Sequence, residues 1–140
     1  MNKITVDTNI LISSIFWKGN PNRIITLCFK GAITLVISRD ILNELERILI
    51  KEKKFELTHD EVFKFIDIIL NHSILVEPIK KLDVVKKDPD DNKILECGIA
   101  GNVDYIISGD NHLLEIKEFE GIKIVSAAKF LSLTDKSSNN

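Results

Sequence analysis

Four acidic residues of the sequence stand where the hydrophobic pattern changes, and together they could hold a metal ion. Asp7 directly follows the apolar run of residues 4–6, and Asp110 comes shortly after a later run of the same kind. Asp91 lies in the first turn of a predicted helix, and Glu44 lies on the helix after the second predicted strand. Carboxylates held close together repel one another, and a divalent cation relieves that repulsion. Oxygen ligands suit Mg²⁺ or Mn²⁺ better than Zn²⁺, and such a centre could activate water for attack on a phosphodiester.

Each of these acidic residues also has a purely structural interpretation. The aspartates of the segment 88–91 surround a predicted helix N-terminus, where acidic caps are ordinary. Asp110 could cap the short helix predicted after it, and Glu44 and Glu46 both flank the apolar stripe of their helix, where surface glutamates are common. Asp7 is harder to explain in this way, because burying a lone carboxylate behind an apolar strand costs free energy. For Asp7 the structural alternative is a buried, hydrogen-bonded aspartate.

Strands and helices alternate along the chain. Short apolar runs predict five strands, at residues 4–6, 33–37, 73–79, 105–107 and 122–125. Helical periodicity and capping residues predict helices at residues 10–17, 21–30, 38–49, 58–70, 88–100, 110–116 and 127–133. This alternation is typical of a parallel sheet covered on both faces, with ligands beyond the carboxyl ends of the strands. We therefore expect the four acidic side chains in one pocket at that edge of the sheet.

The length and composition favour one domain. We expect this domain to span residues 1–134 of the 140, followed by a polar tail at 135–140. At a net charge of −2, binding of nucleic acid would need a local basic patch rather than bulk charge. Cys28 and Cys97 are far apart and predict neither a zinc site nor a disulfide framework. No apolar stretch predicts a signal peptide or a membrane span, so we expect a cytoplasmic protein without a membrane partner.

Three segments of the sequence resemble a known family. The chain is similar to the PIN-domain ribonucleases in its opening at 4–9 (ITVDTN) and in two later blocks, at 88–96 (DPDDNKILE) and 104–110 (DYIISGD). Each block alone is a weak signal, whereas their order and spacing together are specific. The resemblance is to the VapC-like toxin branch, and it extends from Ile4 to about Leu133.

This resemblance implies a fold and a metal site. The implied fold is α/β, a three-layer α/β/α sandwich with a parallel sheet of about five strands. The implied cofactor is Mg²⁺ or Mn²⁺. Carried over by position, the metal ligands and catalytic residues are Asp7, Glu44, Asp91 and Asp110. Asp91 is preferred to Asp90 because Asp91 together with Ile94 fits the family's Asp-x-x-Ile pattern.

Neighbouring polar residues complete the implied site, with one departure from the family. Positions that orient carboxylates or waters in such families are matched here by Thr8, Asn9 and Ser108. Relatives often carry another aspartate two positions after the equivalent of Asp110, where this chain has His112. An auxiliary ligand is thus missing or replaced, while the set of four carboxylates is intact. His59, His72 and His112 form no evident triad, and we expect them to be scattered surface residues.

The resemblance also implies a substrate and a protein partner. The substrate would be single-stranded RNA, cut by an attacking water so that the phosphate stays on the 5′ side. The protein would be the toxin of a type II toxin–antitoxin pair, held by a cognate antitoxin. A basic rim that could contact the RNA is predicted from Arg23, Arg39, Lys51, Lys53, Lys54, Lys86 and Lys87.

Two other functions stay open at the level of sequence. A phosphohydrolase of the haloacid dehalogenase type also places an aspartate after its first strand. Such an enzyme needs a second aspartate two residues later, where this chain has Asn9. A catalytically silent PIN module could instead serve as a platform that binds protein or RNA. The four intact carboxylates weigh against that interpretation.

One predicted helix is apolar on nearly every side. Within the segment 62–70 only Lys64 and Asp67 are polar. Phe65 and Ile68 lie roughly opposite the other apolar residues on a helical projection, so packing one side inward leaves them outward. An exposed apolar helix face favours association, and we expect a homodimer or an antitoxin contact there. Complete burial of this helix is the alternative.

Overall fold

The computed structural model of the chain describes residues 2–86 and 89–138. Lys87, predicted in the basic rim, and Asp88, predicted in the acidic triplet, lie outside the described residues. The strands are β1 (Lys3–Val6), β2 (Thr34–Ser38), β3 (Ser73–Val76), β4 (Tyr105–Ile107), β5 (Glu118–Phe119) and β6 (Ile122–Val125). The helices are α1 (Thr8–Phe16), α2 (Asn20–Phe29), α3 (Arg39–Lys51), α4 (His59–Asn71), α5 (Asn92–Gly101), α6 (Asn111–Leu114) and α7 (Ala127–Ser138). Short 3₁₀ turns occupy Lys53–Phe55 and Pro89–Asp91.

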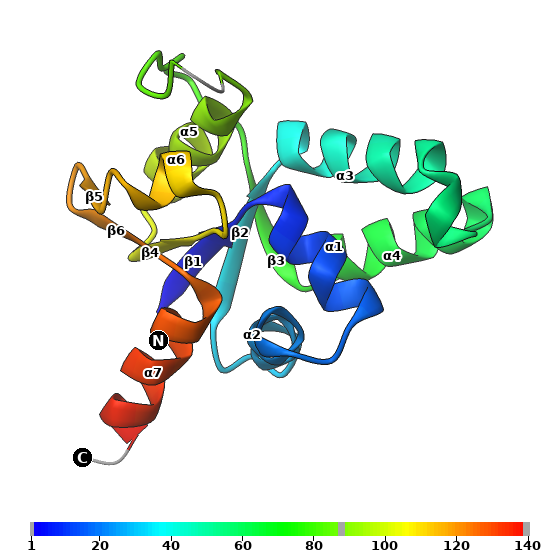
Figure 1. Cartoon of the computed structure of the whole chain (residues 1–140), viewed down its shortest axis with the longest axis horizontal. Helices are drawn as coiled ribbons and strands as arrows, with labels where there is room; N and C mark the ends of the chain where they lie inside the picture. Colours follow the sequence, from blue (N-terminus) through cyan, green and yellow to red (C-terminus); the bar gives the residue numbers. More distant parts are fainter. Residues whose placement is uncertain (1, 87–88, 139–140) are drawn as a thin grey trace.

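The strands form one six-stranded sheet in the order β3-β2-β1-β4-β6-β5. Every neighbouring pair is parallel except β5 and β6, which are antiparallel. Helix α5 packs on the central strands, and Figure 1 shows it on the opposite side of the sheet from α1 and α2. Helices α3 and α4 pack together as a pair, and α7 packs on α2. This arrangement confirms the predicted three-layer α/β/α sandwich.

The central strands are apolar because helices cover both of their faces. The fully buried strand residues include Ile4, Val6, Ile106 and Ile107. Residues 35–37 of β2 are at most 1% exposed. Strands buried on both sides have continuous apolar runs rather than an alternating pattern. The close approach of α5 to the sheet depends on Gly101, where an added Cβ would lie 2.3 Å from a methyl group of Val36. The helix that carries Asp91 is therefore held tightly against β2.

Some predicted element boundaries are wrong. The sixth strand, β5, was not expected, because two residues are too short to show a hydrophobic period. It pairs with β6 through a tight turn in which Glu120 and Gly121 have φ values of 49° and 82°. The predicted strand 73–79 ends at Val76, and α7 continues to Ser138, so part of the predicted polar tail is helical.

Helix α4 is less uniformly buried than a core helix and differs in detail from the prediction. Its start is confirmed, because Thr58 and Glu61 form the reciprocal hydrogen bonds of a capping box at 3.1 Å. Ile68 is exposed as expected, whereas Phe65 is half-buried rather than outward. The helix exposes Phe63 and Leu70 as well. Packing against α3 and β3 therefore covers only part of its apolar surface.

The order in which successive strands are added to the sheet reverses between the parallel strands β1 and β4, and this places a crevice at their carboxyl ends. Strands β2 and β3 lie on one side of β1, and strand β6 lies on the opposite side of the sheet, next to β4. Val6 is in register with Ile107, and the amide of Asp7 donates to the Ile107 carbonyl at 3.1 Å. In sheets of this kind the loops leave such neighbouring strands in opposite directions and open a ligand site. Asp7 and Asp110 lie at that point.

No helix among residues 2–86 and 89–138 has both the length and the apolar character needed to cross a membrane. Cys28 and Cys97 are both buried free thiols, in agreement with the expectation of no disulfide framework.

Candidate functional site

The four predicted acidic residues line one cavity of about 260 Å³ at the crevice between β1 and β4. They reach it from four different elements: the end of β1, helix α3, the turn before α5 and the loop after β4. The remaining lining residues are Thr8, Asn9, Arg47, Ile48, Asp90 and Ile94. The lining contains no described residue of the predicted basic rim, and Arg47 is the basic residue that it does contain.

Asp7 is the most enclosed of the four, with only 6% of its surface exposed. Its Oδ1 atom accepts a hydrogen bond of 2.9 Å from the amide of Ile10 and so caps α1. Burial raises the pKa of its carboxyl, and the negative charge of Asp110 adds to this, although hydrogen bonds from Ser108 and from backbone amides oppose the shift. The folded chain therefore favours a proton or a cation at this carboxylate.

Ser108 connects Asp7 with Asp110. Its fully buried hydroxyl donates a hydrogen bond to Oδ2 of Asp7 and accepts one of 2.9 Å from the amide of Asp110. The amide of Ser108 itself donates to the Val125 carbonyl at 3.1 Å, which ties the loop to β6. The Ser108 hydroxyl thus fixes the Asp7 carboxylate, at the end of β1, relative to the backbone of Asp110, after β4. This contact gives Ser108 the orienting position that the sequence predicted for it.

Glu44 lines the same cavity but has a positively charged partner that the sequence analysis missed. Its carboxylate forms an ion pair with Lys93, and Arg47 lies 4.0 Å away. Burial would raise the pKa of Glu44, but hydrogen bonds from Lys93 and Thr8 and the positive charges of Lys93 and Arg47 outweigh burial and lower it. The Glu44 and Lys93 side chains are only 17% and 19% exposed, so each neutralises a charge that would otherwise be buried alone.

The two flanking polar residues differ in their surroundings. Thr8 is buried beside Glu44, whereas Asn9 is exposed at the rim of the cavity. Asp90, the alternative to Asp91 in the sequence, also reaches the cavity, but its side chain is largely exposed and lies 3.9 Å from Lys93. Asp91 is the better enclosed of the two aspartates.

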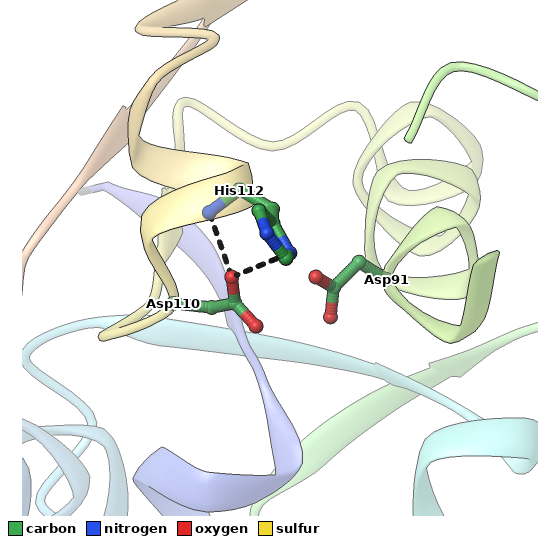
Figure 2. Close-up of side chains that lie close together, drawn as sticks. All are labelled: Asp91, Asp110 and His112. Carbon is green, nitrogen blue, oxygen red and sulfur yellow. Dashed lines mark hydrogen bonds and ion pairs between the residues drawn. The ribbon is translucent and has the colours of Figure 1, made fainter. Parts of the chain in front are cut away.

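Asp91, Asp110 and His112 bring three potential ligand atoms within 4.8 Å of one another. Figure 2 shows the two carboxylates and the imidazole ring converging on one space, Asp91 from one side and the other two from the start of α6. Asp91 occupies the N-cap position of α5, yet among the described residues its side chain makes no capping hydrogen bond to that helix. Asp91 thus stands at a helix N-terminus, as the structural interpretation requires, but within the described part of the chain its side chain does not cap that helix by a hydrogen bond.

Asp110 does cap a helix, and this same contact fixes His112. Its Oδ1 atom accepts a hydrogen bond of 2.7 Å from the amide of His112. His112 is partly exposed and lies beside Asp110 and Asp91, whereas His59 and His72 are exposed, as expected, and lie on or beside α4. The sequence signal for His112 is its spacing of two residues from Asp110.

The donor set suits a divalent cation. The carboxylates of Asp7, Asp91 and Asp110 concentrate negative charge in a small cavity that Glu44 also lines. Beside Asp91 and Asp110, the buried Nδ1 of His112 has no hydrogen-bond partner among the described residues. Carboxylate oxygens with one imidazole form a familiar ligand set for divalent metals. The side chains present therefore fit the metal that the family resemblance implies.

Comparisons with known proteins agree with this fold. In a crystal structure of VapBC2 from Rickettsia felis bound to a DNA fragment from their promoter, one chain is similar at a TM-score of 0.61 and 20% identity, covering 89% of this chain and 98% of that one. No curated protein matches the sequence. A family model described as PIN domain matches residues 3–112, which is most of the chain and includes all four acidic residues and His112. The protein belongs to the PIN-domain family.

Proposed function

We propose that this protein is a metal-dependent endoribonuclease that acts as the toxin of a type II toxin–antitoxin pair. The observation that carries the proposal is the convergence of Asp7, Glu44, Asp91 and Asp110 on one cavity at the β1–β4 crevice. The burial of Asp7 and the position of Asp110 beside it make that cavity unfavourable for the carboxylates without a counter-charge. Membership of the PIN family supports a nuclease over the haloacid dehalogenase alternative.

In this proposal Asp7, Asp91 and Asp110 hold Mg²⁺ or Mn²⁺, and Glu44 contributes from the edge of the cavity. A divalent cation bound there supplies Lewis acidity, which acidifies the attacking water and offsets charge on the phosphodiester. The hydrogen bond from Ser108 orients the Asp7 carboxylate, and Thr8 lines the same cavity as Glu44. Water would attack the phosphorus and the 3′ oxygen would leave as a 3′-hydroxyl, so that the phosphate stays on the 5′ oxygen of the downstream fragment. Asn9 at the rim is placed to contact the substrate or a water.

A second hollow supports a polymeric substrate. It measures about 470 Å³, adjoins the acidic cavity and shares Glu44, Arg47 and Asp90 with it. Lys81 and Lys93 also line this hollow, together with the acidic residues Asp40, Asp83 and Glu96. Lysine and arginine side chains position nucleic acid through its phosphates. An extended single strand of RNA could therefore cross the cavity while its neighbouring phosphates contact Arg47 and the two lysines.

The proposal predicts a substrate preference. We expect the purified protein with Mn²⁺ to cut an unstructured RNA internally, and to cut duplex RNA or single-stranded DNA of the same sequence more slowly. The measurement is gel analysis of labelled oligonucleotides, with release of p-nitrophenol from p-nitrophenyl phosphate measured in parallel. Phosphatase activity without RNA cleavage would instead support a phosphohydrolase. RNA binding without any cleavage would support the silent PIN module.

Similarity to a chain of the VapBC2 structure supports a cognate antitoxin as a protein partner of this chain. The apolar surface that the fold leaves exposed supports, in addition, a homodimer. It consists of Phe63, Ile68 and Leu70 on α4 together with Ile74 and Leu75 on the edge strand β3. Exposed apolar side chains near the edge strand of a sheet favour association between chains.

The dimer makes its own prediction. We expect light scattering of the protein alone, at tens of micromolar, to give the mass of two chains. Ile68→Glu should convert the protein to a monomer, since it places a charge in the apolar surface without touching the core. Asp67→Glu, at the neighbouring exposed position, is the matched control and should stay dimeric. A wild-type monomer would reject the dimer and leave the antitoxin as the proposed user of this surface.

A further inference from the structure

His112 places an imidazole beside Asp91 and Asp110, two carboxylates that line the acidic cavity. Its ring and the carboxylates of Asp91 and Asp110 point toward a common space (Figure 2), and ligand atoms of the three side chains lie within 4.8 Å of one another. We propose that His112 is a metal ligand, and that this nitrogen donor makes the site select Mn²⁺ over Mg²⁺. The inference rests on the proposed function in that it concerns the metal of the same cavity.

One nitrogen of the His112 ring is unsatisfied. This atom, Nδ1, is buried without a hydrogen-bond partner among residues 2–86 and 89–138. It lies 3.6 Å from Oδ1 of Asp110, which is longer than a hydrogen bond. A buried polar atom without a partner costs free energy, so native structures rarely keep one without a reason. A cation held between the ring and the two carboxylates would remove this cost.

The fold holds the His112 ring in place. The amide of His112 donates to Asp110 at 2.7 Å, so the residue is tied to the carboxylate with which it would share the metal. The next residue, Leu113, is fully buried and anchors α6 in the core. The side chain of His112 is 39% exposed, which leaves a face of the ring open to an incoming ion. Preorganisation of this kind is what a metal ligand needs.

The combination of two carboxylates and one imidazole favours one divalent ion over another. Mg²⁺ takes almost only oxygen ligands, keeps much of its water and gains little from an imidazole. Mn²⁺ accepts the same carboxylates and binds imidazole better than Mg²⁺ does. Relatives with aspartate at this position offer oxygen where this chain offers nitrogen. Replacing oxygen by nitrogen at one ligand position therefore moves the preference from Mg²⁺ toward Mn²⁺.

The test is direct metal binding without RNA, by calorimetry and by the electron paramagnetic resonance signal of free Mn²⁺. We expect the wild type to bind Mn²⁺ about tenfold or more tightly than Mg²⁺, and His112→Ala to lose about tenfold in Mn²⁺ affinity with a much smaller change for Mg²⁺. His112→Asp should tighten Mg²⁺ binding relative to wild type and so narrow the difference between the two ions. His59→Ala, at an exposed histidine on α4, is the control and should bind as wild type does.

Melting temperatures in EDTA establish that each variant is folded before metal is added. If Asp110→Asn abolishes Mn²⁺ binding while His112→Ala leaves it unchanged, the role of His112 is overturned and the proposed metal nuclease stands. If the wild type binds neither ion, the metal centre itself is overturned, and the inference about His112 falls with it. Loss of Mn²⁺ selectivity in both His112 variants, with folding intact, supports the inference.

Discussion

Asp7→Asn is expected to reduce RNA cleavage on the order of 10³-fold, because it removes the most enclosed carboxylate of the cavity without changing the shape of the side chain. The amide oxygen can still accept from the Ile10 amide and cap α1, and the Ser108 hydroxyl can rotate to accept from the new amide group. The loss therefore reports on charge rather than on folding. The measurement is the single-turnover cleavage rate of unstructured RNA. Asp67→Asn, an exposed position outside the cavity, should cleave as wild type does.

The same substitution should stabilise the metal-free protein at neutral pH, by roughly 3 °C in melting temperature. Burial raises the pKa of Asp7 above its ordinary value of 3.8, so its ionised form is less favourable in the folded chain than in the unfolded chain. This penalty is absent below pH 3.8, where the carboxyl is protonated in both states, and is complete above the raised pKa. The gain from Asp7→Asn should thus be largest at neutral pH and shrink toward pH 4. A gain independent of pH, or a destabilised variant, would contradict this account of Asp7.

Asn92→Ala is expected to cause the largest loss of stability among single substitutions near the site, about 3 kcal/mol or roughly 10 °C. Asn92 is buried at the start of α5 and holds the connector between β3 and α5 through its contacts with residues 84, 85 and 89. Its Oδ1 atom accepts from the amides of Val84 and Val85 at 2.9 and 2.8 Å, and its Nδ2 atom donates to the carbonyls of Val85 and Pro89 at 3.0 and 3.1 Å. Alanine would leave these groups without their partner, and an unpaired buried polar group costs more than a hydrogen bond contributes.

Thermal and urea unfolding measure this effect, with Asn71→Ala, an exposed position on α4, as the matched control expected to stay within about 0.5 kcal/mol of wild type. Asn92→Asp is informative as well, because it keeps the acceptor for the two valine amides and loses the donor to the two carbonyls. Its stability should lie between those of wild type and Asn92→Ala. A wild-type melting temperature for Asn92→Ala would show that the connector does not depend on this side chain.

The architecture could be predicted because it depends on local patterns that repeat along the chain. Apolar runs such as 4–6 and 105–107 mark strands buried on both faces, and their alternation with helices leaves a parallel sheet as the arrangement that buries them. Strand β5 could not be predicted because its two residues show no hydrophobic period, and it is recognised as a strand by its pairing with β6. Phe65 was misplaced because a helical projection gives the faces of a helix but not how far a neighbouring helix covers them.

The acidic centre could be predicted only in part, for a related reason. Asp7 and Asp110 follow strands that the topology makes neighbours, so their proximity follows from the order of elements. The pairing of Glu44 with Lys93 instead joins α3 to α5, and no spacing in the sequence reveals which charges two separate helices bring together. His112 is visible as a departure from the family pattern, but its convergence with Asp91 depends on the packing of α5 against β4. Residues on different elements required the structure.

The central claim is that this cavity cleaves RNA with a divalent metal, and removal and return of the metal tests it most directly. The wild-type protein is stripped with EDTA, dialysed and incubated with end-labelled unstructured RNA, first without metal and then with added Mn²⁺. Asp7→Asn purified in parallel serves as the control for contaminating nucleases. The account predicts no cleavage by the stripped protein, internal cleavage with 5′-phosphate ends once Mn²⁺ is returned, and none by Asp7→Asn in either condition. Cleavage that persists undiminished in EDTA, or that Asp7→Asn performs as well as wild type, would contradict it.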